Sequence, residues 1–450
     1  MFQLWRDPDF TKCLRTLKIS YSCCIVNAFR FYSRVILLLL SVIVVTTFIL
    51  LWTKELVHIK LVIGVGFHQR IFDSSTVLQR HLDFIREDAR NLEPLIWDRK
   101  IEKEPKTNIA FLKVHKAASS TVQNILFRFG LRRNLTFVLP RPPGFYWRNV
   151  ISMRTSVSKR NVISPPTNKT FNILCSHVIY NREAFRSIMP NSTKYIGILR
   201  EPHSQFLSML RYTNSRVVFN KGTFGKDPIA KYLENPSLYE YKDPYDSYTN
   251  NRMAVEFGFP GHLFKSRNMS GIQLYLKELD KDFDLVMITE MFDESLVLLK
   301  RVMSWNIKDI IYASLNKNRK KHEAYRWLRV SAENFNKWKL LDVELYRYFR
   351  KRLFERIRQE GRGFKQEVQY FKNVQRNVKL FCDGPERTAL TFDKSEFSDA
   401  FQVSRHDCWL IGLHEIKYVD IIRYKQYPEL GVPKELSFVD YNRTIGSIIT

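Results

Sequence analysis

Lys116 stands in a short turn between a predicted strand and a predicted helix, where its charge could bind an anion. The segment reads TNIAFLKVHKAASSTVQNILFRFG (107–130). Its run 108–114 is apolar, as in a buried strand, and apolar residues recur at helical spacing after Ser120. The first N–H groups of a helix lack partners within the helix and carry partial positive charge. This junction therefore predicts an anion site.

The other side chains of the turn suit a phosphate group. Small residues let an anion approach the backbone, and hydroxyl groups can donate hydrogen bonds to it. The residues of this kind are Ala117, Ala118, Ser119, Ser120 and Thr121. The turn holds no glycine and lacks the GxxxxGK(S/T) pattern, so it is not the loop of nucleoside triphosphatases. Taken alone, the stretch also fits an N-capped helix with a surface lysine.

A second stretch adds an arginine and a serine of matching chemistry. The apolar run 195–199 predicts a strand that ends in Arg200, and Pro202 suits the first turn of a helix. Ser208 lies further along that helix. Arginine binds phosphate through two hydrogen bonds and serine can add another, so we expect both side chains to face one cleft at the carboxyl edge of a sheet.

These two stretches resemble a known pair of motifs. FLKVHKAASST and ILREPHSQFLSMLRY are similar to the two motifs that bind 3′-phosphoadenosine 5′-phosphosulfate (PAPS) in membrane-bound carbohydrate sulfotransferases, above all in the galactose-3-O-sulfotransferase family. Residues 247–259, 283–305 and 338–349 also resemble that family. The resemblance runs from 107 to 385, with a weaker similarity over 408–429.

The resemblance implies a fold, a reaction and a donor site. The fold would be the P-loop-like α/β sulfotransferase fold, with a central, mostly parallel sheet flanked by helices. The reaction would move a sulfuryl group from PAPS to a sugar hydroxyl, most directly the 3-hydroxyl of galactose on a glycolipid or glycoprotein. Lys116 and 117–121 would hold the 5′-phosphosulfate, and Arg200 and Ser208 the 3′-phosphate. Ala117 stands where the family commonly has threonine, which removes one hydroxyl but leaves the backbone donors.

Transfer to an alcohol also requires a proton acceptor. A general base contributes about 10²–10⁴-fold, and histidine is available in its neutral form near neutral pH. His177 follows the apolar run 171–174 and is the predicted base, since a similarly placed histidine resembles the base of related enzymes. A structural histidine bonded to a backbone carbonyl is the competing interpretation. His115 is the other candidate, expected to shape the turn beside the predicted catalytic Lys116.

Weaker signals indicate acceptor-binding residues. Glu290 ends a strand-like run and is predicted to bind the sugar, to orient a base or to form a structural ion pair. Asn250, Asn251 and Arg252 are predicted to line the acceptor cleft. No group of histidine, cysteine and aspartate residues has zinc-like spacing, and no nucleophile triad is recognisable, so the predicted mechanism requires no metal.

The elements that must position these residues alternate between strand-like and helical patterns. The strand-like runs are 108–114, 171–174, 195–199 and 283–289, which favours an α/β fold with a mostly parallel sheet. The segment 343–380 is a long amphipathic helix interrupted near Gly361 and Gly363 and rich in arginine and lysine. Its basic face is either solvated or attracts acidic substrates or lipid headgroups.

An uncharged run at 35–52, VILLLLSVIVVTTFILLW, has the length of a membrane-spanning helix, which needs roughly 17–25 residues. The preceding flank is richer in lysine and arginine, so the N-terminus is expected to stay cytoplasmic. A cleaved signal peptide fits less well, because the polar lead is long. The predicted order is a tail (1–34), an anchor (35–52), a luminal stem (53–106) and a luminal sulfotransferase domain (107–450), in a single-pass type II protein of the Golgi membrane. Helical spacing in the stem allows a homodimer.

Glycosylation sequons and cysteines agree with a luminal domain. The sequons stand at Asn134, Asn168, Asn191, Asn268 and Asn442. Cys382 and Cys408 could form a disulfide and leave Cys175 free, although spacing alone leaves the pairing open.

The charge balance points to an anionic partner. The chain has 450 residues and a formal net charge of +27. Nucleic acid is an improbable partner because a luminal domain does not meet it. Two alternatives stay open: a sulfotransferase for uronic acid or hexosamine of a glycosaminoglycan, since the donor motifs do not read the acceptor, and a catalytically silent luminal glycan-binding protein.

Overall fold

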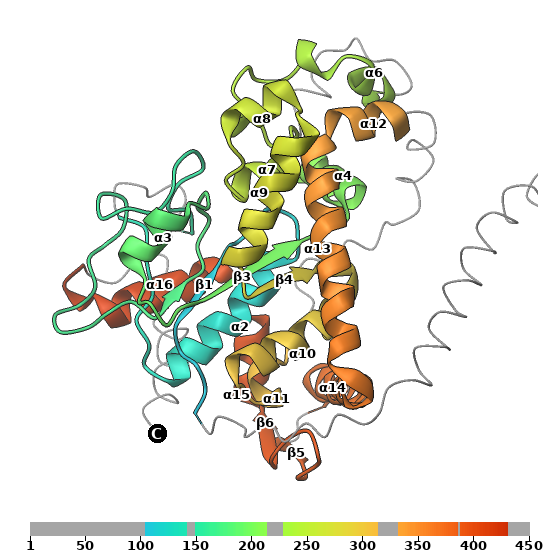
Figure 1. Ribbon diagram of the computed structural model, residues 1–450. Helices are drawn as coiled ribbons and strands as arrows, with labels where there is room; N and C mark the ends of the chain where they lie inside the picture. Colours follow the sequence, from blue (N-terminus) through green and yellow to red (C-terminus); the bar gives the residue numbers. More distant parts are fainter. Residues whose placement is uncertain (1–103, 142–148, 214–227, 314–331, 386–387, 431–450) are drawn as a thin grey trace, which may run out of the picture. The chain divides into compact units, whose positions relative to one another are not determined.

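The computed structural model describes residues 104–141, 149–213, 228–313, 332–385 and 388–430 (Figure 1). The predicted tail, the anchor at 35–52 and nearly all of the stem lie outside the described residues. Within the described ranges, no helix combines the length and the apolar composition that crossing a membrane requires.

Four parallel strands form the central sheet in the order β2-β1-β3-β4. Ile109 of β1 pairs with Ile173 of β2, and Gly197 of β3 pairs with Val286 of β4. The strands are β1 (Ile109–Phe111), β2 (Ile173–Leu174), β3 (Lys194–Leu199) and β4 (Leu285–Ile288). They fall on the predicted apolar runs, so the predicted α/β fold with a mostly parallel sheet is confirmed.

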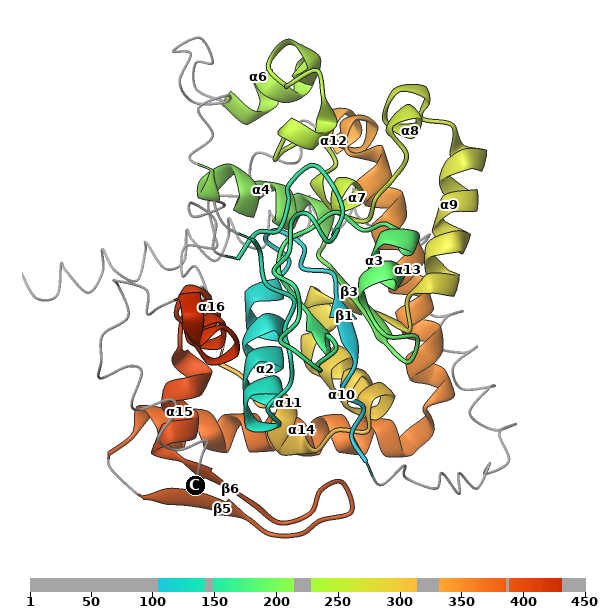
Figure 2. The same ribbon diagram turned by 90° about the vertical axis from the view of Figure 1, so that its left-hand side faces the viewer.

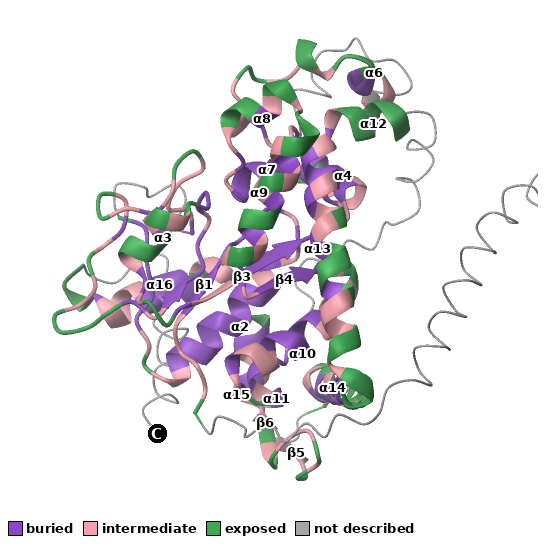
Figure 3. Cartoon of the chain, in the orientation of Figure 1, coloured by how far each residue is buried: buried purple, intermediate pink, exposed green. Residues whose placement is uncertain are grey.

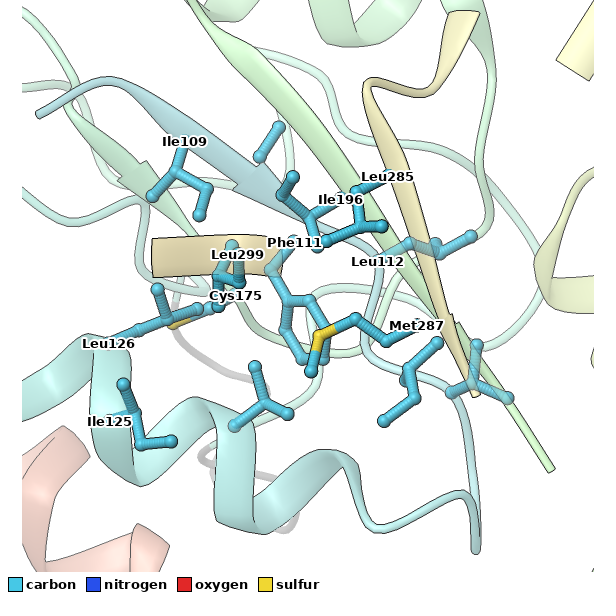
Figure 4. Close-up of a cluster of buried hydrophobic side chains, with 14 of the residues drawn as sticks. Ile109, Phe111, Leu112, Ile125, Leu126, Cys175, Ile196, Leu285, Met287 and Leu299 are labelled. Carbon is cyan, nitrogen blue, oxygen red and sulfur yellow. The ribbon is translucent and has the colours of Figure 1, made fainter. Parts of the chain in front are cut away.

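Helices α2 (Ser119–Arg132) and α10 (Phe292–Met303) pack on the sheet and close the main core (Figure 4). Ile125 of α2 and Leu299 of α10 lie in one buried cluster with Phe111 of β1. Burial of such side chains contributes roughly 1.5–3 kcal/mol each. Figure 3 shows that the sheet and α2 are buried almost throughout, whereas exposed residues follow one face of α13 (Leu340–Gln359).

The predicted long basic helix is two helices. α13 packs along β4, and α14 (Gly361–Asp383) packs against α10. The chain turns at Gly361, whose φ of 76° is a backbone conformation that glycine adopts without strain. The predicted interruption near Gly361 and Gly363 is therefore confirmed at the first of these glycines.

The C-terminal segment folds back onto α2 (Figure 2). Strands β5 (Ala389–Phe392) and β6 (Phe401–Ser404) form an antiparallel pair, followed by α15 (Arg405–Gly412) and α16 (Glu415–Gln426). Cys382 and Cys408 are joined by a disulfide, and Cys175 is a buried free cysteine, as one predicted arrangement had it. Burial raises the pKa of Cys175 to about 12, so its thiol stays protonated.

The other described helices have between 3 and 14 residues. They are α3 (Arg182–Ile188), α4 (Pro202–Tyr212), α6 (Pro228–Glu234), η2 (Pro236–Leu238), η3 (Pro244–Asp246), α7 (Arg252–Glu256), α8 (Gly261–Ser266), α9 (Met269–Asp282), η4 (Thr289–Met291), α11 (Ile307–Ile310), α12 (Ala332–Trp338) and η5 (Pro428–Leu430). The sequon asparagines Asn134, Asn168, Asn191 and Asn268 are all exposed, and Asn442 lies outside the described residues.

Candidate active site

The turn between β1 and α2 has an unusual backbone. Lys116 and Ala118 each have φ of 59°, in the left-handed region that residues other than glycine rarely adopt. Ala118 precedes α2 without giving it a side-chain cap, so the first amides of this helix are not capped by that residue. Alternating left-handed residues of this kind form concave arrays of N–H groups that bind anions. The backbone here fits the predicted 5′-phosphosulfate site.

The hydroxyl side chains of this turn are used unequally. Ser119 Oγ donates to the Val114 carbonyl oxygen at 2.6 Å, so its hydrogen is directed into the protein and not toward a ligand. Ser120 Oγ accepts a hydrogen bond from Lys113 Nζ at 3.0 Å. Thr121 is buried. Backbone N–H groups and the lysine are therefore better placed than these hydroxyls to contact an anion.

Ala117 packs into the core with no exposed surface. Its carbonyl oxygen lies 2.9 Å from Thr289 Oγ1, which donates to it. A threonine at this position would place its hydroxyl inside the protein. The alanine side chain has no polar group, so it fits this buried site.

One lysine lies in the turn, Lys116, and a second, Lys113, lies shortly before it. The ammonium of Lys116 rests 4.2 Å from the centroid of the Tyr212 ring. Burial, together with the nearby Arg200, lowers the pKa of Lys116. Lys113 is buried and its ammonium forms an ion pair with Glu415 of α16 at 2.8 Å. The C-terminal segment thus supplies the carboxylate that neutralises Lys113.

Arg200 joins the two predicted donor-binding stretches. It follows β3, and its Nη1 donates to the carbonyl oxygen of Lys116 at 3.0 Å. Ser208 lies partly exposed in α4, the helix that begins directly after Arg200 at Pro202. The Glu201 side chain caps α4 by accepting from the amides of the second and third helical residues.

His115 is bound to a buried carboxylate. Its backbone N–H donates to Glu256 Oε2 at 2.9 Å, and its Nδ1 donates to Glu256 Oε1. Arg252 Nε donates to the same Oε1 at 3.2 Å. Glu256 and Arg252 have side chains only 2% and 1% exposed, so this is a buried charge pair that orients a histidine. Since the carboxylate only accepts, the lone pair of His115 stands on Nε2.

His177 lies directly against this group. Its ring stacks on that of His115 with centroids 3.8 Å apart. Its Nδ1 lies 2.9 Å from the carbonyl oxygen of Lys113, which only accepts, so Nδ1–H donates and Nε2 carries the lone pair. The competing structural interpretation, a backbone carbonyl partner, is thus observed, but the same bond leaves Nε2 available as a base.

Burial dominates the titration of both histidines. It lowers the pKa of His115 despite the opposing effect of Glu256. It also lowers the pKa of His177 well below its ordinary value, and His115, Lys113 and Arg252 add to this. For Glu256, burial would raise the pKa, but His115 and Arg252 outweigh it and the pKa is lowered. At neutral pH the site therefore holds two neutral histidines and one carboxylate.

The weaker acceptor candidates have other partners. Glu290 accepts from the backbone N–H of Glu201 at 3.0 Å and from the Tyr346 hydroxyl at 3.1 Å. Asn251 is buried; its Nδ2 donates to Asn250 Oδ1 and to the Trp338 carbonyl, both at 2.9 Å.

Asn251 Oδ1 accepts from the backbone N–H of Asp342 at 3.1 Å. The side chain of Asn251 thus links α7 to α13. Its neighbour Asn250 is partly exposed. That Asn250 and Asn251 line the acceptor cleft stays a prediction.

Several residues of this site were not predicted from the sequence, although some of them stand in recognisable local patterns. Lys113 interrupts an apolar run, which is a sign of a buried charge with a partner. Arg252 and Glu256 stand at i and i+4 of a helix and could have been paired from spacing. Glu415 has no local signal, because its partner lies far away in the chain.

His115, His177 and Glu256 each offer a potential metal-ligand atom, and these atoms lie within 4.8 Å of one another. Both Nδ1 atoms are already committed to hydrogen bonds, and the carboxylate also holds Arg252. Within the described part of the chain, this is the group of residues that could hold a metal ion. The negative charge of Glu256 is already balanced by the guanidinium of Arg252.

Comparison with known proteins matches this chain to sulfotransferases. The galactose-3-O-sulfotransferase family model matches residues 25–406. Galactose-3-O-sulfotransferase 2 of Sus scrofa is 31% identical over 387 residues, which cover 79% of this chain and 93% of that protein. Galactosylceramide sulfotransferase of Bos taurus is 31% identical over 284 residues, covering 62% of this chain and 64% of that protein. Galactose-3-O-sulfotransferase 3 of Homo sapiens is 31% identical over 287 residues, covering 62% and 64%.

Proposed function

Because the chain belongs to the galactose-3-O-sulfotransferase family, we propose that it moves a sulfuryl group from PAPS to a sugar hydroxyl, the 3-hydroxyl of galactose on a glycolipid or glycoprotein. The observation that carries the proposal is the 3.0 Å hydrogen bond from Arg200 to the carbonyl of Lys116. It brings together the two stretches that resemble the motifs for the two ends of the donor nucleotide.

The residues at this junction fit a doubly anionic nucleotide. The left-handed turn at Lys116 and Ala118 presents backbone N–H groups at the start of α2, where the helix dipole adds positive charge. Arg200 directly follows β3 and Ser208 lies in α4, and both side chains have chemistry suited to the 3′-phosphate. The ammonium of the partly buried Lys116 needs only to leave the Tyr212 ring to meet an anion.

Transfer forms a bond from the acceptor oxygen to sulfur and breaks the bond from sulfur to the bridging phosphate oxygen. Adenosine 3′,5′-bisphosphate leaves with the electron pair of that bond. Lys116 stabilises the charge that builds on the bridging oxygen, because its ammonium belongs to the turn that holds the phosphate. The acceptor hydroxyl gives its proton to a histidine Nε2.

His115 is the better acceptor for that proton. Once protonated, His115 is stabilised by Glu256, to which it already donates from Nδ1. A proton on His177 would instead lie beside Lys113 and Arg252, and among the described residues the ring hydrogen-bonds only to the Lys113 backbone carbonyl. We therefore assign the base to His115, and His177, predicted from the sequence, becomes the stacked neighbour that holds its ring. The matched variants His115→Ala and His177→Ala decide between them by their kcat.

Features outside and inside the described residues support our proposal for the location of the enzyme. The uncharged run 35–52 and its basic flank support a single-pass type II anchor in the Golgi membrane. The exposed sequons Asn134, Asn168, Asn191 and Asn268 support a luminal domain. Removal of N-glycans from the cell-made protein tests this topology by a shift in apparent mass, and an unchanged mass contradicts it.

The reaction is tested with the full chain, labelled PAPS and a panel of galactosides and desulfated glycosaminoglycans. We expect label on the 3-position of galactose, and Lys116→Ala should abolish transfer. Lys351→Ala is the matched control, because this lysine is 78% exposed on α13. Label only on glycosaminoglycans would favour that alternative acceptor. Nucleotide uptake without transfer would favour a silent binding protein, and absence of both would refute the proposal.

A further inference from the structure

We propose that Tyr248 is the stacking residue of the acceptor site and selects the galactose ring. This inference rests on the proposed function, because it assumes a sugar acceptor. The side chain lies beside the group that we assign as the base: the ring centroids of Tyr248 and His115 are 5.9 Å apart, edge to face. At this separation the two rings are in direct contact, so a sugar stacked on Tyr248 would lie beside the imidazole and not between the rings. A sugar lying on Tyr248 would therefore have a hydroxyl next to the imidazole.

The backbone around Tyr248 is firmly held. Both neighbours, Ser247 and Thr249, are buried, and Ser247 Oγ accepts from the amides of Thr249 and Asn250 at 3.0 and 2.9 Å. Lys339 Nζ donates to the Thr249 carbonyl at 3.0 Å. The ring of Tyr248 is thus presented from a fixed position, which lowers the entropy lost when a ligand stacks on it.

The ring of Tyr248 packs against His115 and Arg252, but its hydroxyl differs from those of other tyrosines in the domain. Other tyrosines of this domain hydrogen-bond through their hydroxyls: the partly buried Tyr275 donates to the Gly258 carbonyl at 2.8 Å, and the buried Tyr418 donates to the Leu410 carbonyl at 2.6 Å. Within the described ranges, no hydrogen bond engages the hydroxyl of Tyr248, which is only partly buried. Its polar end is therefore available to a ligand.

Burial keeps the phenol of Tyr248 in its neutral form. Burial raises the pKa of Tyr248; Arg252 opposes this, while Tyr212, Glu256 and Tyr241 add to it. The guanidinium of Arg252 lies 5.5 Å from the ring centroid. Tyr248 is thus a phenol at neutral pH, with an apolar face for stacking and a hydroxyl that can donate to a sugar oxygen.

An aromatic ring such as that of Tyr248 favours galactose over glucose as its stacking partner. Because the 4-hydroxyl of galactose is axial, its C3–H, C4–H and C5–H bonds point to one side and form an apolar patch. Such a patch packs on an aromatic ring, whereas the equatorial 4-hydroxyl of glucose divides the C–H bonds between the two faces. Ligand sites in general combine aromatic walls with a few polar groups that fix orientation. Tyr248 would be the wall and His115 the polar group at the reacting oxygen.

The test measures acceptor KM, kcat and nucleotide affinity for Tyr248→Ala, Tyr248→Leu and Tyr248→Phe in the full chain. An aromatic contact of up to about 1.5 kcal/mol corresponds to about a tenfold change. We expect Ala and Leu to raise the galactoside KM about tenfold and to reduce the preference for galactoside over glucoside. Phe should stay within about threefold. Affinity for adenosine 3′,5′-bisphosphate, measured by calorimetry, should not change.

Tyr370→Ala is the matched control, since Tyr370 is a partly buried tyrosine of α14 whose ring lies against Phe397. An unchanged galactoside KM in Tyr248→Leu, an equal loss for galactoside and glucoside, or a parallel loss of nucleotide affinity overturns the inference. If the unaltered chain transfers sulfuryl to galactosides while Tyr248→Leu does so equally well, only this inference fails. If the unaltered chain transfers to no sugar, the proposed function fails and the inference with it.

Discussion

Replacing Glu256 by glutamine removes one charge from the centre of the site and keeps its shape. The three nearest groups all donate to this carboxylate: the backbone N–H and Nδ1–H of His115, and Nε–H of Arg252. Glutamine offers a single acceptor oxygen, and its NH₂ group would face a donor in either orientation. Glu256→Gln therefore breaks at least one hydrogen bond and leaves the buried Arg252 without a counter-charge.

Two magnitudes follow from this geometry. A hydrogen bond to a charged group contributes about 1.5–3 kcal/mol, so losing the one that stabilises protonated His115 should lower kcat roughly 10- to 150-fold. Breaking a buried ion pair by removing one partner costs about 3–5 kcal/mol of folding free energy. Both groups are almost fully buried, so solvent does not screen this loss.

The measurement pairs steady-state kinetics with unfolding at several pH values. The folded-state pKa of Glu256 is lowered, because His115 and Arg252 outweigh the effect of burial. Its stabilising contribution is therefore complete above the ordinary pKa of 4.5 and is lost as the pH falls below it. We expect the difference in stability between the unaltered chain and Glu256→Gln to shrink below pH 4.5. Nucleotide affinity should stay the same.

The reasoning would be refuted by a variant with normal kcat, since His115 would then not depend on the carboxylate. A loss of nucleotide affinity equal to the loss of kcat would also contradict it, because that result indicates a disturbed turn and not a displaced base. Glu344→Gln is the control, since this α13 carboxylate pairs with the exposed Arg347 and lies outside the site.

Three further predictions concern the same domain. Because burial lowers the pKa of both His115 and His177, the acid limb of kcat/KM should have its midpoint below the ordinary histidine value of 6.5; a midpoint above it contradicts the assignment. Glu415→Gln leaves Lys113 buried without its ion-pair partner and should lower the free energy of unfolding by about 3–5 kcal/mol, measured by denaturant titration. An unchanged midpoint would show that this ion pair between α16 and Lys113 does not stabilise the fold. Reducing the disulfide that joins α14 to α15 should lower stability by about 2–4 kcal/mol, read as a lower Tm under reducing conditions, and an unaltered Tm would count against it.

Local patterns predicted the elements that carry the site. The strand before Lys116, the helix after it and the strand before Arg200 all follow from apolar runs and helical spacing. The chain turns at Gly361, where a helix of continuous amphipathic pattern meets a residue that can adopt a positive φ. These features depend on neighbours a few residues apart, so one sequence suffices to find them.

What the sequence by itself determined is thus the order of strands and helices and the residue types at their junctions. Only the tertiary structure decided which charges meet: Glu256 with His115, and Glu415 with Lys113, a partner 302 positions away. It also decided the left-handed backbone at Lys116, which no glycine signals. The physical reason is that buried charges pair with whatever the packed fold brings within reach, and strained backbone persists only when the surrounding contacts hold it.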